Sequence, residues 1–471
     1  MRLTILLLLL AVTAHAGLVD RVKGFFKGGN IIDRIKNATL TRFGKIFVKT
    51  GLFSFGKKLN EIRKKTMEKL KLTWQKKKAE LEQKMKVILS RRDDTVEDKD
   101  TIVEINAASN IGKDLFQSDI LLTKKQTEEL EQAIDGTSTR ERRQAFRDQN
   151  YPNTTWPEAK VYYKFDESAA EHSIVLIKEE GCWSYVGRTG GEQPLSLGVG
   201  CEEVGTAAHE LGHALGLFHT MSRYDRDDFI TIALENVRED FVDQYIKETP
   251  ETTTNYGLTY DYGSIMHYGA TGASHNKKPT MLANDVNSQE AMGSHIMAFI
   301  DKSMINDHYN CKANCKHVSP DQCKNGGFPH PMKCHECICP SGYGGPYCDQ
   351  RPAGCGRTLV AKPSKQFLID KLGFGGPVRD DFTFCNYWIE APKGKKVEVK
   401  INSISHGYAY DGCVLGGVEI KSNQDQIRTG YRFCSPNDRN VVLVSATERL
   451  PVITFNRLGQ QQVILEYKYI D

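Results

Sequence analysis

The sequence predicts an α+β domain followed by a small disulfide-rich module and an all-β sandwich. Three observations predict this order. A histidine-rich helical segment lies near the middle of the 471-residue chain, downstream of segments with strand character. Six cysteines crowd into residues 315–348, a stretch too short to fold around an apolar core without bridges. From residue 355 to residue 471, strands of alternating apolar and polar residues carry four further cysteines.

The segment 209–219 has the sequence HELGHALGLFH and the spacing of a metal site. His209 and His213 are four residues apart, so on a helix both imidazoles leave the same face and can bind one ion. His219 follows six residues later, too far around a straight helix. Gly216 can end the helix in the left-handed conformation, which lets the chain turn and bring His219 back to the metal.

Three neutral imidazoles predict one catalytic Zn²⁺, because at least one coordination position stays open for water. Zinc lowers the pKa of this water to about 7, so the neighbouring Glu210 can take its proton as general base. The predicted reaction is peptide-bond hydrolysis, with His209, His213 and His219 as metal ligands. The alternative is a surface helix whose histidines have this spacing by chance.

The flanking residues match a wider pattern. Gly216 and His219 complete the metzincin motif, and GSIMHY at 263–268 supplies its Met-turn. Together with SRYDRD at 222–227, these residues resemble the astacin family of zinc endopeptidases. The resemblance implies that Tyr268 is a further zinc ligand that swings away to stabilise the transition state, and that Met266 lies beneath the site. The sequence alone would make both residues ordinary buried side chains.

Residues 1–16 predict a secretory signal peptide, with an apolar run followed by the small-residue cleavage site Ala14-His15-Ala16. No later stretch reaches transmembrane length, so we expect a secreted, extracellular protein without a transmembrane segment. The net charge of +4 is too small to imply a nucleic-acid partner, and the predicted secretion argues against one.

Residues 17–143 contain no cysteine and predict a helical, basic propeptide. Lys57–Arg92 has apolar residues at roughly helical spacing, which favours a solvated helix over a surface that binds glycosaminoglycan or membranes. RERR at 140–143 predicts cleavage after Arg143 by a processing protease of the furin type. Such a site just before the first folded segment predicts a zymogen.

The astacin resemblance also implies how the zymogen would be kept silent. In that family an aspartate in a short F-x-G-D motif of the propeptide occupies the open position on the zinc. Its nearest match is FQSD at 116–119, where Ser118 replaces the glycine and Asp119 is the predicted zinc blocker. Asp119 would alternatively cap the helix predicted through 127–130.

The catalytic domain is predicted to span 144–311. Residues 182–188 and 193–197 resemble the strand pair above the family's cleft, and 193–197 is predicted to be the edge along which substrate lies extended. The chain departs from the family at Thr220, where a glutamate normally anchors the mature amino terminus. It is also shortened near 166–174, where the family has a long helix, a cysteine and a further strand.

The chain has 13 cysteines, an odd number for a secreted protein. Residues 312–350 resemble an EGF-like module and residues 355–471 a CUB sandwich. These resemblances imply six bridges: Cys182–Cys201, Cys315–Cys334, Cys323–Cys337, Cys339–Cys348, Cys355–Cys385 and Cys413–Cys434. Cys311 stays unpaired, because its family partner belongs to the missing segment. A zinc knuckle built from Cys334, His335, Cys337 and Cys339 is disfavoured in an oxidising compartment.

We therefore predict a zymogen-type zinc endopeptidase that cleaves extracellular proteins and docks to matrix or cuticle ligands through its EGF-like and CUB modules. Asn37 and Asn153 begin N-glycosylation triplets. Calcium binding near Asp411 is not expected, because no full set of carboxylates accompanies it. The alternative is a secreted binding protein whose shortened catalytic domain is only a scaffold.

Overall fold

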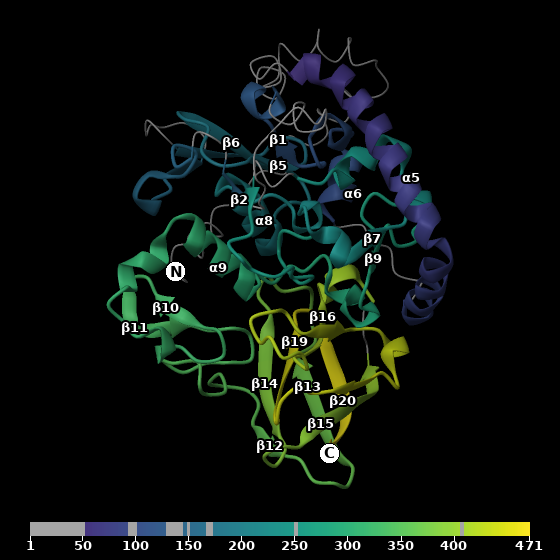
Figure 1. Ribbon diagram of the computed structural model, residues 1–471, viewed down its shortest axis with the longest axis vertical. Helices are drawn as coiled ribbons and strands as arrows, with labels where there is room; N and C mark the ends of the chain where they lie inside the picture. Colours follow the sequence, from purple (N-terminus) through teal and green to yellow (C-terminus); the bar gives the residue numbers. More distant parts are fainter. Residues whose placement is uncertain are drawn as a thin grey trace.

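The computed structural model describes residues 52–92, 101–128, 145–147, 151–165, 173–248, 253–405 and 409–471. Residues 145–311, which belong to the predicted catalytic domain and are called the catalytic part below, lie above a β-sandwich, with a long helix along one side (Figure 1). The predicted signal peptide, Asn37 and the cleavage site after Arg143 lie outside these ranges. None of the described helices combines the length and the apolar composition needed to span a bilayer.

The catalytic part contains a five-stranded sheet with the strand order β1-β5-β6-β4-β3. Strand β4 is parallel to β3 and β6, β5 is antiparallel to β6, and β1 is parallel to β5. The strands are β1 (Ile120–Leu121), β3 (Tyr163–Phe165), β4 (Ser173–Ile177), β5 (Cys182–Tyr185) and β6 (Glu192–Leu197).

The prediction that residues 193–197 form the substrate-binding edge is wrong. Strand β6 is hydrogen-bonded to β5 on one side and to β4 on the other, so its backbone has no free edge. Strand β5 lies outside β6, and β1 from the N-terminal segment pairs with its outer side. On this side of β6, the strand that can pair with a further extended segment is therefore β5, whose outer side is paired with β1 in this structure.

The sheet packs on α8 (Val204–Ala214), the helix that carries the histidine motif. Ile174 and Leu195 lie in one buried cluster with Ala214, and the Trp156 indole donates a hydrogen bond to the Ala214 carbonyl at 2.9 Å. Helix α9 (Phe299–His308) lies between the catalytic part and the smaller module (Figure 1). Two short strand pairs complete this part: β2 (Ala145–Phe146) with β8 (Thr253–Thr254), and β7 (Ile230–Ile232) with β9 (Met281–Ala283).

Downstream of α9, β10 (Phe328–His330) and β11 (Lys333–Ile338) form a hairpin held by three disulfides. A sandwich of two sheets follows, with strand orders β12-β14-β19-β16-β17 and β13-β20-β15-β18. Its strands are β12 (Thr358–Val360), β13 (Gln366–Gly373), β14 (Thr383–Glu390), β15 (Lys396–Ser405), β16 (Gly416–Ile420), β17 (Tyr431–Phe433), β18 (Val442–Val444), β19 (Arg449–Asn456) and β20 (Gln460–Ile470).

The structure contains six disulfides, and their cysteine pairs are those that the family resemblances imply: Cys182–Cys201, Cys315–Cys334, Cys323–Cys337, Cys339–Cys348, Cys355–Cys385 and Cys413–Cys434. Cys311 is a free, half-buried thiol. Because Cys334, Cys337 and Cys339 are all bridged, they have no thiolate to offer a metal, which rules out the zinc-knuckle alternative.

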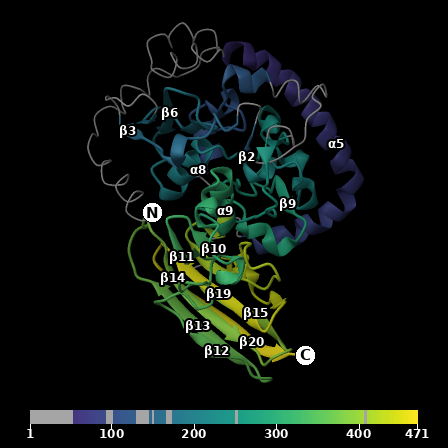
Figure 2. The same cartoon turned by 60° about the vertical axis from the view of Figure 1, so that its left-hand side comes forward.

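The described part of the N-terminal segment contains α5 (Leu52–Arg91) and α6 (Ile102–Ala108); the Thr101 hydroxyl caps the first turn of α6. The preference for a solvated helix over Lys57–Arg92 is wrong for the C-terminal half of α5. Leu81 and Ile88 are 1% and 2% exposed and pack against Ala233 and Leu282. Figures 1 and 2 show α5 lying along the catalytic part down to the level of the sandwich.

Candidate functional site: a buried histidine cluster

Helix α8 presents the first two histidines of the motif to one buried point. His209 and His213 project from the same helix face, and their Nε2 atoms lie 3.1 Å apart. The helix ends at Ala214, and Gly216 follows with a φ of +100°, in the left-handed region that the sequence predicts. A Cβ at Gly216 would lie 2.9 Å from the His308 ring, so both the turn and the packing there favour glycine.

The turn brings His219 to the same point, with its Nε2 atom 3.1 Å from that of His209. All three rings are at least 97% buried. Each Nδ1 lies 2.7 Å from an oxygen that can only accept a hydrogen bond: Ile265 O for His209, Leu217 O for His213 and Gln117 Oε1 for His219. These acceptors place the proton of each ring on Nδ1, so the three Nε2 lone pairs point at one another.

Asp119 is the fourth member of this cluster. Its Oδ2 lies 3.2 Å from His209 Nε2 and 3.1 Å from His219 Nε2, and its Oδ1 lies 3.5 Å from His213 Nε2. The alternative role of Asp119 as a helix cap is wrong. Thr123 occupies that position, because its hydroxyl accepts a hydrogen bond from the Gln126 amide at 3.3 Å.

The donor set fits a zinc ion. Burial lowers the pKa of His213 and brings that of His219 to about 3, so both imidazoles are neutral, as metal binding requires. Three converging lone pairs and a buried carboxylate leave this point without a positive charge, which one divalent cation would supply. His209, His213, His219 and Asp119 would hold the Zn²⁺.

The loop that carries Asp119 is shaped to reach the histidines. Gln117 and Ser118 have φ values of +49° and +77°, which turn the chain sharply between Phe116 and Ile120. Strand β1 then pairs with β5, and the Ser184 amide donates to the Asp119 carbonyl at 3.1 Å. The left-handed conformation at Ser118 explains why the family motif has glycine there.

Glu210 points into the same buried region. It is 0% exposed, and neither carboxylate oxygen has a hydrogen-bond partner among the described residues. Burial, and then repulsion from the Asp119 carboxylate, raises the pKa of Glu210 well above its ordinary value. A carboxyl group in this position is suited to exchange a proton with a species bound beside it.

Tyr268 and Met266 approach the cluster from the Met-turn. The Tyr268 hydroxyl lies 2.6 Å from Asp119 Oδ2 and 2.5 Å from the Gln117 carbonyl oxygen. Met266 packs beneath α8, where a Cβ at Gly212 would lie 2.4 Å from its sulfur. Glycine at position 212 therefore allows the close approach of the Met-turn to the helix between the two histidines.

Sequence reasoning missed two residues that position this site. Gln117 binds His219 Nδ1, and Asp301 accepts hydrogen bonds from the Ile265 amide at 2.9 Å and the Ser264 hydroxyl at 2.6 Å. Gln117 is the second residue of the FQSD segment that contains Asp119, so the sequence could have indicated that it lies close to the site. Asp301 lies 37 residues beyond Ser264, and nothing in the local sequence indicates their contact.

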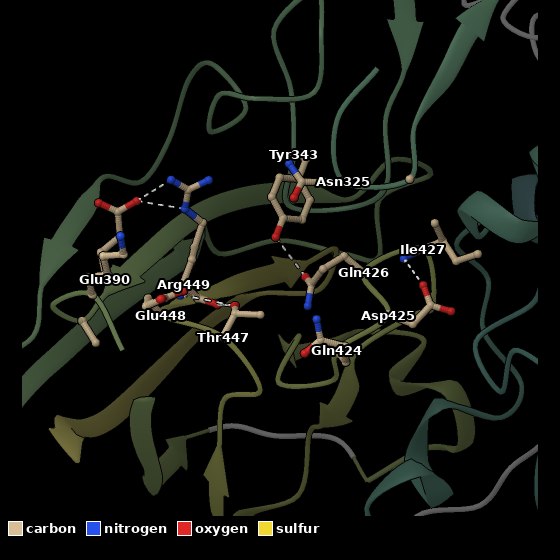
Figure 3. Close-up of a pocket in the computed structure, with 13 residues that line it drawn as sticks. Asn325, Tyr343, Glu390, Gln424, Asp425, Gln426, Ile427, Thr447, Glu448 and Arg449 are labelled. Carbon is tan, nitrogen blue, oxygen red and sulfur yellow. Dashed lines mark hydrogen bonds and ion pairs between the residues drawn. The ribbon is translucent and has the colours of Figure 1, made fainter. Parts of the chain in front are cut away.

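A separate hollow lies between the disulfide-rich module and the sandwich (Figure 3). Its volume is about 690 Å³, and residues of the histidine cluster do not line it. Tyr343 from the small module donates a hydrogen bond to Gln426 of the sandwich at 3.1 Å across it (Figure 3). The lining is largely polar and includes Asn325, Glu390, Gln424 and Arg449.

Comparison with known proteins identifies the family to which the chain that carries this site belongs. The model of the Astacin peptidase family matches residues 163–310. Zinc metalloproteinase nas-31 of Caenorhabditis elegans is 47% identical over 412 residues, which cover 80% of this chain and 67% of that protein. Zinc metalloproteinase nas-23 of the same organism is 34% identical over 393 residues, covering 76% and 72%.

Among solved structures, the hatching enzyme zinc-protease High choriolytic enzyme 1 of Oryzias latipes is 34% identical. The match covers 31% of this chain and 72% of that chain, with a TM-score of 0.29. The histidine cluster lies within the residues that the family model matches, and the relatives extend the similarity across most of the chain. The chain is a zinc metalloendopeptidase with one catalytic zinc, and it belongs to the astacin family.

Proposed function

We propose that the chain is the zymogen of a secreted endopeptidase in which Asp119 blocks the catalytic zinc. The observation that carries this proposal is the position of Asp119, whose carboxylate lies within 3.5 Å of all three histidine Nε2 atoms. A carboxylate in this position excludes both the attacking water and the substrate carbonyl. Cleavage after Arg143 by a furin-type protease would separate residues 17–143 from the catalytic domain, 144–311, and allow Asp119 to leave.

In the unblocked enzyme, Glu210 is the general base. The zinc, when bound, would acidify water and polarise the scissile carbonyl. Glu210 follows His209 in α8, and its unpartnered carboxylate takes the proton of the attacking water and delivers it to the departing amine. In the blocked state, burial and then repulsion from Asp119 raise the pKa of Glu210, and the second contribution is lost when Asp119 leaves.

Tyr268 stabilises the transition state in this proposal. Burial, and then the neighbouring Asp119, raises the pKa of the Tyr268 hydroxyl well above its ordinary value, so the group remains a proton donor. In the blocked state it is held by Asp119 and Gln117. Loss of these two partners frees the hydroxyl to donate a hydrogen bond to the oxyanion of the tetrahedral intermediate.

The C-terminal modules, EGF-like at 312–350 and CUB at 355–471, are proposed to dock the enzyme to matrix or cuticle proteins. The hollow of about 690 Å³ between them supports this role, because its size and its exposed amide and charged groups suit a polar protein segment. Six disulfides support folding in an oxidising, extracellular compartment. Asn153 is exposed in a turn, as a glycosylation site requires.

The test uses the full chain before and after cleavage at Arg143, with zinc content and hydrolysis of a protein substrate as readouts. We expect about one zinc per chain in both forms and activity only after cleavage. Glu210→Ala should keep the zinc and lose activity, whereas Asp119→Ala should show activity before cleavage. A cleaved chain without zinc or activity, but with folded C-terminal modules, would instead support a non-catalytic binding protein.

A further inference from the structure

The C-terminal end of α5 lies where the catalytic part meets the sandwich. Arg92, directly after the helix, donates a hydrogen bond from Nη1 to Asp411 Oδ1 at 2.8 Å, and the two side chains are 15% and 6% exposed. The Asn437 side-chain amide donates to the Arg92 carbonyl at 3.1 Å. The N-terminal segment is thus attached to the sandwich as well as to the catalytic site.

Asp411 connects this arginine to the catalytic part. Its second oxygen, Oδ2, accepts hydrogen bonds from the amide and the hydroxyl of Thr271, at 2.7 and 2.6 Å. Thr271 lies three residues after Tyr268, in the chain that leaves the Met-turn. One buried carboxylate therefore joins the N-terminal segment, the catalytic part and the sandwich, and both of its oxygens accept hydrogen bonds from protein groups.

The position of Asp411 is fixed by close backbone packing. Gly412 has a φ of +72°, and a Cβ there would lie 2.2 Å from the backbone of Gly293 in the catalytic part. A side chain at position 412 would push the sandwich away from the catalytic part. The carboxylate that binds Arg92 is therefore also held by contacts that do not involve the arginine.

The surroundings of this junction are acidic. Asp438, in the 3₁₀ helix Pro436–Asp438, is buried, and Glu290, in the 3₁₀ helix Val286–Ala291, is half-buried; the two carboxyl groups are within hydrogen-bonding reach of each other. The positive charge of Arg91 acts on both carboxyl groups, and Arg91 also donates to Asn287 at 3.1 Å. The end of α5 thus brings two arginines to a junction that carries three acidic side chains, Asp411, Glu290 and Asp438.

We propose that this junction is a docking surface for the α5 end of the N-terminal segment, and that it retains the segment on the enzyme after the chain is cut at Arg143. The partner is residues 74–92 of this same chain, which bind through Arg92 on Asp411 and through Leu81 and Ile88 on the catalytic part. The inference rests on the proposed zymogen and adds a second, non-covalent anchor to the Asp119 block. Cleavage alone then leaves the active site covered until the α5 anchor dissociates.

The test measures how long the N-terminal fragment stays bound to the cleaved full chain. A specific protease site in place of residues 140–143 makes the cut independent of any processing enzyme. Arg92→Ala removes the anchor, and Lys78→Ala, which breaks an exposed pair with Glu82 on the same helix, is the matched control. We expect Arg92→Ala to release the fragment roughly 10- to 100-fold faster than Lys78→Ala or the wild type.

A second measurement uses a synthetic peptide of residues 74–92 and the cleaved protein freed of its fragment. We expect specific binding that weakens at least tenfold in an Arg92→Ala peptide and on Asp411→Asn protein. Both readouts score binding, so they stay informative even if the cleaved protein proves inactive and the proposed function fails. Equal release from the Arg92→Ala and Lys78→Ala chains, with no loss of peptide binding, would overturn the proposal.

Discussion

Replacing Ser118 by glycine is expected to tighten the block at the histidine cluster. Ser118 is fully buried with a φ of +77°, and its hydroxyl has no hydrogen-bond partner among the described residues. Both features disfavour serine, because the left-handed conformation strains an L-residue and a buried hydroxyl needs a partner. Glycine removes both costs. The backbone carbonyl of residue 118 can still accept the hydrogen bond that the Asn106 side-chain amide donates to it at 2.8 Å.

The magnitude follows from these two terms. The left-handed conformation costs an L-residue about 1–2 kcal/mol, of which glycine returns roughly half after its larger loss of chain entropy. An unpaired buried hydroxyl costs about 1–3 kcal/mol. A total near 2 kcal/mol is therefore reasonable, which corresponds to a ~30-fold change in the equilibrium between blocked and open states.

The assay is the rate at which a chelator removes zinc from the uncleaved full chain, because chelator access requires the 116–121 loop to open. Ser118→Gly should lose zinc ~30-fold more slowly than the wild type. Ser118→Ala, which removes the hydroxyl but keeps the strained conformation, should lie between them. A glycine variant that loses zinc as fast as the wild type would refute the idea that position 118 stores strain in this loop.

Three further outcomes are expected. Leu81→Ala should lower the free energy of unfolding by about 2–4 kcal/mol in denaturant melts, whereas Leu72→Ala, at a position 60% exposed, should have little effect. Burial raises the pKa of Glu203, but the hydrogen bond with His295 and the charge of Arg457 outweigh it and bring this pKa to about 2. Stability should therefore fall as the pH drops from 4.5 toward 2, and Glu203→Gln should flatten that part of the stability–pH curve. Thiol titration of the denatured, unreduced chain should find one free thiol, and none in Cys311→Ser; two or more thiols would contradict the disulfide set.

The sequence was most informative where the chemistry depends on local spacing. His209, His213 and the turn at Gly216 follow from the geometry of a single helix and its end. Asp119 is harder to place, because its motif is incomplete and the sequence favours the zinc-blocking role only slightly over a helix cap. Its role depends on a contact 90 residues away, which only the folded chain brings within 3.2 Å.

The errors all concern contacts between segments that are distant in sequence. Whether residues 193–197 lie at an edge of the sheet depends on the positions of β4 and β5, and the sequence of one strand does not determine the order of strands in the sheet. The apolar residues at helical spacing, Leu81 among them, are visible in the sequence, but the contacts of Leu81 and Ile88 with Ala233 and Leu282 are not. A charged helix with one narrow apolar stripe is therefore a poor basis for predicting a solvated element.

The shortening predicted near residues 166–174 bears directly on whether the catalytic part can fold. Strand β4, which follows this segment, is covered on one face, where Ile174 and Leu176 pack with residues of α8. Val175 and Ile177, which point the other way, belong to a buried cluster with Ile111 and Leu115 from the N-terminal segment. The N-terminal segment therefore contributes core as well as inhibition, and the uncleaved chain should be more stable than the cleaved enzyme once its fragment has left.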